Sequence, residues 1–139
     1  MPNPIQTQRY CILKPDKGPV QIKFSVSNEI MAGADFKIYD ESKINTLDEW
    51  KMTVENNSYS LRTFKTNVKN LNKAILAFQI LCCSLKNNIF QGTVELEIIQ
   101  DNESCQMTLP AKWQRDNIPP CVLNNPDMFG GSITFILKS

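Results

Sequence analysis

Four basic residues are spaced so that their side chains could act together on a negatively charged partner. Lys65, Lys69 and Lys73 follow one another at intervals of four, and Arg62 precedes them by three. Intervals of three and four place side chains on one face of a helix. Positive charges gathered in this way can bind the phosphate groups of acidic lipids or of nucleic acid. The spacing therefore predicts an anion-binding face made by Arg62, Lys65, Lys69 and Lys73.

The charge around these residues is unevenly distributed, although the formal net charge of the chain is only +1. The segment 28–55 holds seven acidic residues and three lysines, and the segment 56–94 holds five basic residues and no acidic one. Two interpretations are open for the basic residues: a solvated helix face, or a face that binds an anionic partner. Near an acidic membrane each Lys or Arg contributes about 1 kcal/mol, so four of them would give a salt-sensitive attachment.

Residues suited to catalysis are scarce in this sequence. The chain has no histidine, which excludes Ser-His-Asp and Cys-His nucleophilic sites and His-Cys zinc sites. The Gly130-Gly131 pair does not form a phosphate loop and predicts a turn. A solvated strand face explains Glu95 and Glu97 better than a catalytic carboxylate pair. We therefore expect a protein that is not an enzyme and that holds no cofactor and no metal.

The cysteines and the apolar segments carry predictions about the environment of the chain. No pair of cysteines has the C-x-x-C spacing, and we expect reduced, packed thiols. Cys82 and Cys83 are adjacent in the sequence, so they cannot both face one core. No long apolar run and no signal-peptide pattern is present, so we expect neither a membrane-spanning helix nor secretion. The five cysteines are Cys11, Cys82, Cys83, Cys105 and Cys121.

Most of the chain has the two-residue alternation of half-buried strands. Polar turn sequences separate these segments, and Asn56-Asn57-Ser58 is expected to join two of them in a hairpin. A second turn is expected at residues 101–104. The predicted strands lie near residues 10–13, 20–26, 34–38, 50–54, 59–61, 94–98, 105–109 and 133–137.

The segment 64–86 determines the predicted fold class. Its apolar residues follow one another at steps of three and four, which is helical spacing. The part from Ala74 to Cys83 also fits a buried strand, but a pattern of about twenty residues is long for a strand. We predict an α+β fold, with an antiparallel β-sheet packed against one long or two short helices at about residues 64–86. A flexible N-terminal arm at residues 1–7 would precede a single globular domain at residues 8–139.

Two segments resemble the globular core of rhabdovirus matrix proteins, most closely those of the vesiculovirus type. The likeness covers roughly residues 50–86 and 90–113. The first segment contains Lys51-Met-Thr-Val54, Asn57, Arg62-Thr-Phe64, Ile75-Leu-Ala-Phe78 and Ser84-Leu-Lys86. The second contains Gly92-Thr-Val-Glu-Leu96, Asp101-Asn-Glu-Ser104 and Pro110-Ala-Lys-Trp113.

The resemblance implies a structural viral protein without catalytic activity. Such a matrix protein self-associates under the viral envelope, binds acidic membrane and the viral ribonucleoprotein, and drives virion assembly and budding. It implies a location in the virion beneath the envelope, in the host cytoplasm and at the inner face of the host membrane, with host proteins as further partners. The membrane or nucleocapsid contact then falls to the four basic residues. The arm residues that would dock on a neighbouring copy are Met1, Pro2, Pro4 and Ile5.

The chain also departs from that family. It is short, it lacks a long basic N-terminal segment, and it contains no PPxY or PTAP motif for recruiting host budding machinery. Two other functions therefore stay open. One is a soluble β-rich adaptor that binds another protein by an exposed edge strand. The other is a carrier that encloses a small apolar ligand in a cavity.

Overall fold

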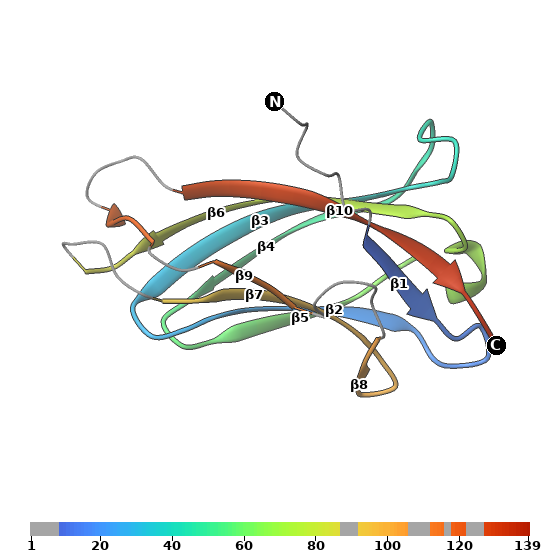
Figure 1. Cartoon of the computed structure of the whole chain (residues 1–139), viewed down its shortest axis with the longest axis horizontal. Helices are drawn as coiled ribbons and strands as arrows, with labels where there is room; N and C mark the ends of the chain where they lie inside the picture. The colour runs from blue at the N-terminus through green and yellow to red at the C-terminus, as the bar shows by residue number, and fades with distance from the viewer. Residues whose placement is uncertain (1–8, 87–91, 106–111, 116–117, 122–126) are drawn as a thin grey trace, which may run out of the picture.

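The computed structural model describes residues 9–86, 92–105, 112–115, 118–121 and 127–139. In this part of the chain the strands form two sheets and there is no α-helix (Figure 1). A short 3-10 turn, η1 (Val68–Asn70), precedes β6. The strands are β1 (Arg9–Leu13), β2 (Val20–Val26), β3 (Ile30–Tyr39), β4 (Thr46–Glu55), β5 (Tyr59–Thr63), β6 (Ile75–Ser84), β7 (Val94–Gln100), β8 (Glu103–Ser104), β9 (Lys112–Arg115) and β10 (Asp127–Leu137).

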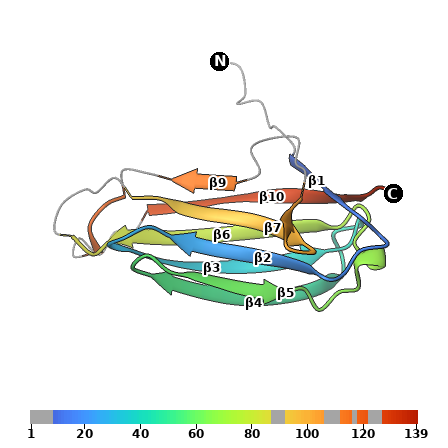
Figure 2. The same ribbon diagram turned by 90° about the horizontal axis from the view of Figure 1, so that it is seen from below.

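The two sheets lie face to face as a β-sandwich. Sheet A has the order β1-β10-β6-β3-β4, in which β1 and β10 are parallel and the other neighbours antiparallel. Sheet B has the order β5-β2-β7-β8, and β9 also pairs with β7. Figure 2 shows the long strands of both sheets running along the same direction, which is the aligned type of sheet packing.

Alternation in the sequence explains which side of each strand is buried. In β2, Val20, Ile22, Phe24 and Val26 face inward, and the residues between them are half-buried. A single core cluster of apolar side chains fills the space between the sheets. Within it the Phe36 ring stacks on the Trp50 ring, with 5.1 Å between their centroids. The predicted strands at 10–13, 20–26, 34–38, 50–54, 59–61, 94–98 and 133–137 are confirmed. The predicted strand at 105–109 lies, apart from its first residue, outside the described residues.

The predicted helix at residues 64–86 is wrong, and with it the α+β fold class. The segment consists of a loop that contains η1, followed by the ten-residue strand β6. Leu76, Phe78, Ile80 and Cys82 are buried at every second position, which is the strand pattern. The helical spacing arose because two apolar loop residues, Val68 and Leu71, happen to precede this strand at steps of three and four. The apolar pattern is too long for one strand only because it runs through the loop and the strand together.

Two further local predictions are corrected by the sheet topology. The turn after β4 does not form a hairpin, because β5 pairs with β2 in sheet B while β4 pairs with β3 in sheet A. Asn56 and Asn57, both with positive φ, therefore carry the chain from one sheet to the other. Gly130 and Gly131 lie within β10 rather than in a turn. A β-carbon on Gly130 would lie 2.7 Å from the backbone oxygen of Phe78, so this close strand contact favours glycine.

The expectation of reduced thiols is wrong for two of the five cysteines. Cys83 and Cys121 form a disulfide, which joins the end of β6 to the segment 118–121. Cys82 continues the inward-facing side of β6, and Cys83 faces the other way, as expected for adjacent strand residues. Cys11, Cys82 and Cys105 are free and buried. A disulfide is typical of proteins in oxidising compartments.

Candidate functional site

Arg62 is the first of the predicted anion-binding residues, and the structure places it in an internal ion pair. Its guanidinium donates to both carboxylate oxygens of Asp48, at 2.8 and 3.0 Å. The same group lies over the Trp50 ring, 4.1 Å from the centroid. The Asp48 side chain is 3% exposed and that of Arg62 20%. Arg62 therefore joins β5 to β4 and does not face a partner.

The environment of Asp48 keeps its carboxylate ionised. Burial raises the pKa of Asp48, but the hydrogen bonds from Arg62 and from the backbone N–H of Lys65 more than offset this effect. The pKa of Asp48 consequently lies below its ordinary value of 3.8. The N–H of Lys65 donates to this carboxylate at 2.9 Å, which also fixes the start of the loop after β5.

The other three basic residues do not share one face either. Lys73 has a positive φ of 64° and its ammonium group lies 3.7 Å from the carboxylate of Glu41. Lys65 and Lys69 are exposed and line a hollow of about 510 Å³ together with Lys17, which comes from the loop between β1 and β2. Asp16 also lines this hollow. Lys17 could not be found from helical spacing because it belongs to a distant part of the sequence.

The uneven charge of the sequence is partly neutralised within the molecule. Asp48 and Glu41 belong to the acidic segment 28–55, and their partners Arg62 and Lys73 belong to the basic segment 56–94. Part of the charge that suggested an anionic partner therefore serves internal ion pairs. The possible arm contacts of Met1, Pro2, Pro4 and Ile5 lie outside the described residues.

The long edge strand β4 offers a different kind of site, made of backbone groups. Within the described residues β4 pairs on one side only, with β3. On its other side the Leu47 carbonyl accepts from the Thr66 hydroxyl, and the Glu49 N–H donates to the Asp48 carboxylate. Backbone groups two residues apart point the same way along a strand. The N–H and C=O groups of Lys51 and Thr53 consequently point away from β3.

This open stretch of β4 has defined ends. The loop that carries Lys65 and Thr66 covers its start through the contacts to Asp48 and Leu47. At the other end the Glu55 N–H donates to the Ser58 hydroxyl. No hydrogen bond from the described part of the chain reaches the outward N–H and C=O groups of Lys51 and Thr53. An exposed row of such groups can accept a further strand.

Charged side chains follow the open edge on the outer face of sheet A. The Lys37 ammonium on β3 lies 3.9 Å from the Glu49 carboxylate on β4, and Lys51 lies 3.6 Å from Asp35 in the next row. These four residues line a shallow hollow of about 640 Å³ on this face. Charged edges resist pairing with unrelated apolar strands, so a partner strand must carry complementary charges.

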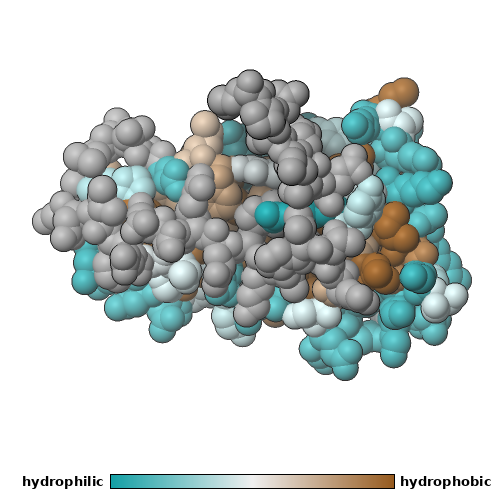
Figure 3. Space-filling model, in the orientation of Figure 1, coloured by the Kyte–Doolittle hydropathy of each residue, from teal (hydrophilic) through white to brown (hydrophobic). Residues whose placement is uncertain are grey.

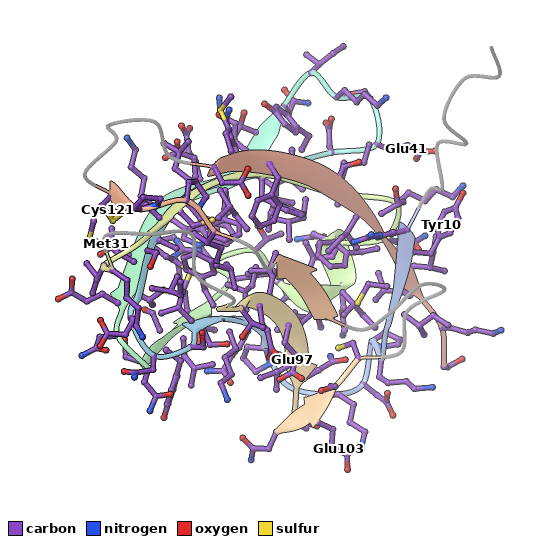
Figure 4. The ribbon with its side chains drawn as sticks, turned by 60° about the vertical axis from the view of Figure 1, so that its left-hand side comes forward. Tyr10, Met31, Glu41, Glu97, Glu103 and Cys121 are labelled. Atoms are coloured by element: carbon purple, nitrogen blue, oxygen red, sulfur yellow. A yellow bond between two sulfur atoms is a disulfide. The ribbon has the colours of Figure 1, made fainter. Side chains whose placement is uncertain are left out.

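Exposed apolar side chains lie on another part of the outer face of sheet A. Figure 3 shows hydrophilic side chains over much of the coloured surface, with the hydrophobic ones in separate patches. Met31, Leu81 and Met128 are exposed on the outer face of sheet A. Met31 and Cys121 lie at the same end of the molecule (Figure 4) and line a hollow of about 330 Å³. Nothing in the structure shows what would cover this patch.

Metal binding and membrane spanning can be judged for the part of the chain that the structure describes. There, no group of three His, Cys, Asp or Glu side chains could hold a metal ion. No helix there is both long and apolar enough to cross a bilayer. Comparison of the chain with protein-family models, curated proteins and solved structures gave no match. The resemblance to rhabdovirus matrix proteins therefore stays a prediction from the sequence.

Proposed function

We propose that this chain is a non-catalytic structural module whose copies associate by pairing β4 with β4 around a two-fold axis. The observation that carries the proposal is the charge order on the open edge of β4, where Glu49 and Lys51 flank Trp50. Such an edge is complementary to itself in one antiparallel register. Self-association through identical surfaces is the commonest way in which protein chains assemble.

The charges select this register from its neighbours. Centring the pair on Trp50 puts Glu49 of each copy opposite Lys51 of the other copy. In this register the Glu49 N–H must exchange its hydrogen bond to the Asp48 carboxylate, 2.8 Å long in the single chain, for one to the Lys51 carbonyl of the second copy. Centring it on Lys51 would bring two lysines together, and centring it on Glu49 would bring two glutamates together. Opposite charges across antiparallel strands stabilise the pair by about 0.2–1 kcal/mol each, and like charges destabilise it.

The neighbouring strand extends the same pattern. Lys37 pairs with Glu49 and Asp35 with Lys51 inside each copy. In the register centred on Trp50, each row across the four central strands would therefore alternate in sign, from Lys37 and Glu49 to Lys51 and Asp35 of the second copy. The two five-stranded copies of sheet A would join in one continuous sheet. No new charge would be left without a partner of opposite sign.

A viral matrix protein must also associate with copies of itself. The proposed pairing of β4 with β4 is therefore compatible with the matrix hypothesis. A specific observation favours acidic membrane as a further partner: Lys17, Lys65 and Lys69 line one hollow and are exposed. Phosphate headgroups of anionic lipids suit such a cluster. The adaptor hypothesis uses the same edge of β4, with a strand of another protein in place of the second copy.

Charge reversal tests the proposal in a way that separates pairing from folding. Glu49→Lys would place lysine opposite Lys51 of the second copy, and Lys51→Glu would place glutamate opposite Glu49. Each variant alone should therefore associate at least about tenfold more weakly than the unaltered chain. A mixture of the two variants would pair lysines with glutamates, so association should return on mixing. Light scattering after size-exclusion chromatography measures the result.

The control is Lys138→Glu, which makes the same charge change on an exposed residue far along the chain from β4. It should leave association unchanged. A chain that stays monomeric at every concentration, or variants that stay monomeric when mixed although they remain folded, would overturn the proposal. If the unaltered chain were monomeric but captured a defined partner strand on the β4 edge, the adaptor hypothesis would replace it.

A further inference from the structure

We infer that Cys11 and Cys105 are the site of a second disulfide, which forms when the chain meets a small-molecule disulfide such as oxidised glutathione. The site is distinct from the β4 edge and from the Cys83–Cys121 disulfide. It would join β1, at one edge of sheet A, to the residue that follows β8 in sheet B. The inference does not depend on the proposed function.

The two thiols are in contact in the folded chain. A hydrogen bond links the side chains of Cys11 and Cys105, although 94 positions separate them in the sequence. Both side chains belong to the core cluster, with Cys11 fully buried and Cys105 8% exposed. Such a contact places two cysteines that are distant in the sequence side by side between the two sheets.

Backbone contacts hold the two cysteines in this position. The Cys105 N–H donates to the Ile98 carbonyl on β7 at 2.9 Å. Two residues further along β7, the Gln100 side chain accepts from the Lys14 N–H at 2.9 Å and donates to the Lys14 carbonyl at 2.8 Å. Lys14 directly follows β1, three residues after Cys11. The end of β1 is thus fixed to the end of β7, and Cys105 is fixed to β7 as well.

A small oxidant can approach the pair from one side. Cys105 lines a hollow of about 290 Å³ together with Lys14, Lys17 and Ser104. Figure 4 shows Glu97 on β7 and Glu103 on β8 on the same side of the molecule, and the Ser104 hydroxyl donates to Glu97 at 2.7 Å. Cys105 is therefore the sulfur that solvent reaches first, and Cys11 lies behind it.

The access of solvent to Cys105 sets the order of reaction, and the hydrogen bond between the thiols favours the same order. By donating to Cys105, the Cys11 thiol lowers the pKa of Cys105. The same hydrogen bond, together with burial, raises the pKa of Cys11. Thiolates and not thiols attack disulfides. Cys105 therefore acts as the attacking thiol, and Cys11 as the thiol that completes the exchange.

The exchange balances in two steps. The Cys105 thiolate attacks one sulfur of oxidised glutathione, and the other half leaves as a glutathione thiolate, which takes up the proton that Cys105 lost. Cys11 then loses its proton and attacks the Cys105 sulfur of the mixed disulfide, which releases the second glutathione. Two protein thiols are oxidised, and one oxidised glutathione is reduced to two molecules of glutathione.

The test is the number of free thiols after equilibration with oxidised and reduced glutathione in varied ratio. The folded full-length chain is denatured in the presence of an alkylating agent, and the disulfide-linked peptides are identified by mass spectrometry without reduction. The three free thiols should fall to one, Cys82, with a peptide that joins Cys11 to Cys105. Closing so long a loop should also raise the melting temperature by roughly 10 °C.

Two variants serve as controls. The Cys105→Ser variant should keep the thiols of Cys11 and Cys82. The Cys82→Ser variant should still lose the thiols of Cys11 and Cys105. The linked peptide is identified in the unaltered chain, so poor folding of a variant does not obscure that result. Three thiols that persist under oxidising conditions, a mixed glutathione adduct that persists on Cys105, or a linkage to Cys82 instead would each overturn the inference.

Discussion

The carboxylate of Asp48 accepts hydrogen bonds from both terminal nitrogens of the Arg62 guanidinium, at 2.8 and 3.0 Å, and so joins sheet A to sheet B. The two residues lie on β4 and β5, which follow each other in the chain but belong to different sheets. No strand ladder connects β4 to β5, so side chains must hold this side of the sandwich together. The ion pair and the stacking of Arg62 on Trp50 perform this task.

Replacing Asp48 by alanine should strongly destabilise the fold. The substitution would leave the largely buried Arg62 without its partner and would remove the acceptor of the Lys65 and Glu49 N–H groups. Loss of one member of a buried ion pair lowers the free energy of unfolding by about 3–5 kcal/mol. Urea unfolding, followed by tryptophan fluorescence, measures the change. As a control, Asp35→Ala breaks the exposed ion pair with Lys51. This substitution should lower the free energy of unfolding by at most about 1 kcal/mol. Equal effects of the two substitutions would contradict this account.

The same ion pair predicts how stability depends on pH. The pKa of Asp48 is lowered in the folded chain from the ordinary 3.8, so folding favours the ionised carboxylate. This contribution is fully present above about pH 4 and is lost as the pH falls through the lower pKa of the folded state. The free energy of unfolding should therefore decrease below pH 4. The decrease should be shallower in Asp48→Asn, which has no proton to bind there. Parallel pH profiles of the two proteins would argue against the assignment.

Reduction of the Cys83–Cys121 disulfide should destabilise the chain without unfolding the sandwich. The disulfide closes a loop of 38 residues, which corresponds to about 3–4 kcal/mol of chain entropy in the unfolded state. The segment 118–121 keeps other contacts, because the Ser84 N–H donates to the Pro119 carbonyl and Ile118 is fully buried. Cys83→Ser should therefore unfold at lower urea concentration but with an unchanged circular dichroism spectrum. Identical midpoints with and without reducing agent would refute this prediction.

Much of the strand structure follows from alternation that can be seen in the sequence. β2 and β7 each carry apolar residues at every second position, and their predicted spans match the observed ones closely. The error at 64–86 has a local cause. Val68 and Leu71 are buried loop residues, and their spacing from β6 imitates a helix. Periodicity reports which residues are buried, and it cannot tell whether one element or two provide them.

The candidate site could be predicted only in part, because its contacts are non-local. Spacing along the sequence could not show that Arg62 meets Asp48, or that Lys17 lies beside Lys65 and Lys69. Strand pairing has the same limit, because a turn such as Asn56-Asn57-Ser58 can lead to the neighbouring strand or to the other sheet. The charges of Glu49 and Lys51 are visible in the sequence, but only the strand order shows that they lie on an open edge.

Membrane binding should depend on Lys65 and Lys69 and much less on Lys73. The first two are exposed beside Lys17, whereas the Lys73 ammonium already lies near the carboxylate of Glu41. Each lysine close to an acidic surface contributes about 1 kcal/mol. Replacing both Lys65 and Lys69 by glutamine should therefore weaken binding to phosphatidylserine-rich vesicles by about 30-fold. The effect of Lys73→Gln should be several times smaller than the effect of this double variant.

Flotation with vesicles measures this prediction, with neutral phosphatidylcholine vesicles and raised salt as controls. Binding should be confined to acidic vesicles and should fall as salt increases, because the contact is made by exposed charges. If these lysines shared one face of a helix, Lys69 and Lys73 would contribute equally to membrane binding. If Lys73→Gln reduces binding as much as the double variant, the contact surface differs from the hollow around Lys17. If the unaltered chain floats with neither kind of vesicle, this basic cluster does not bind membrane by itself, and the β4 edge stays the only interaction surface proposed for the chain.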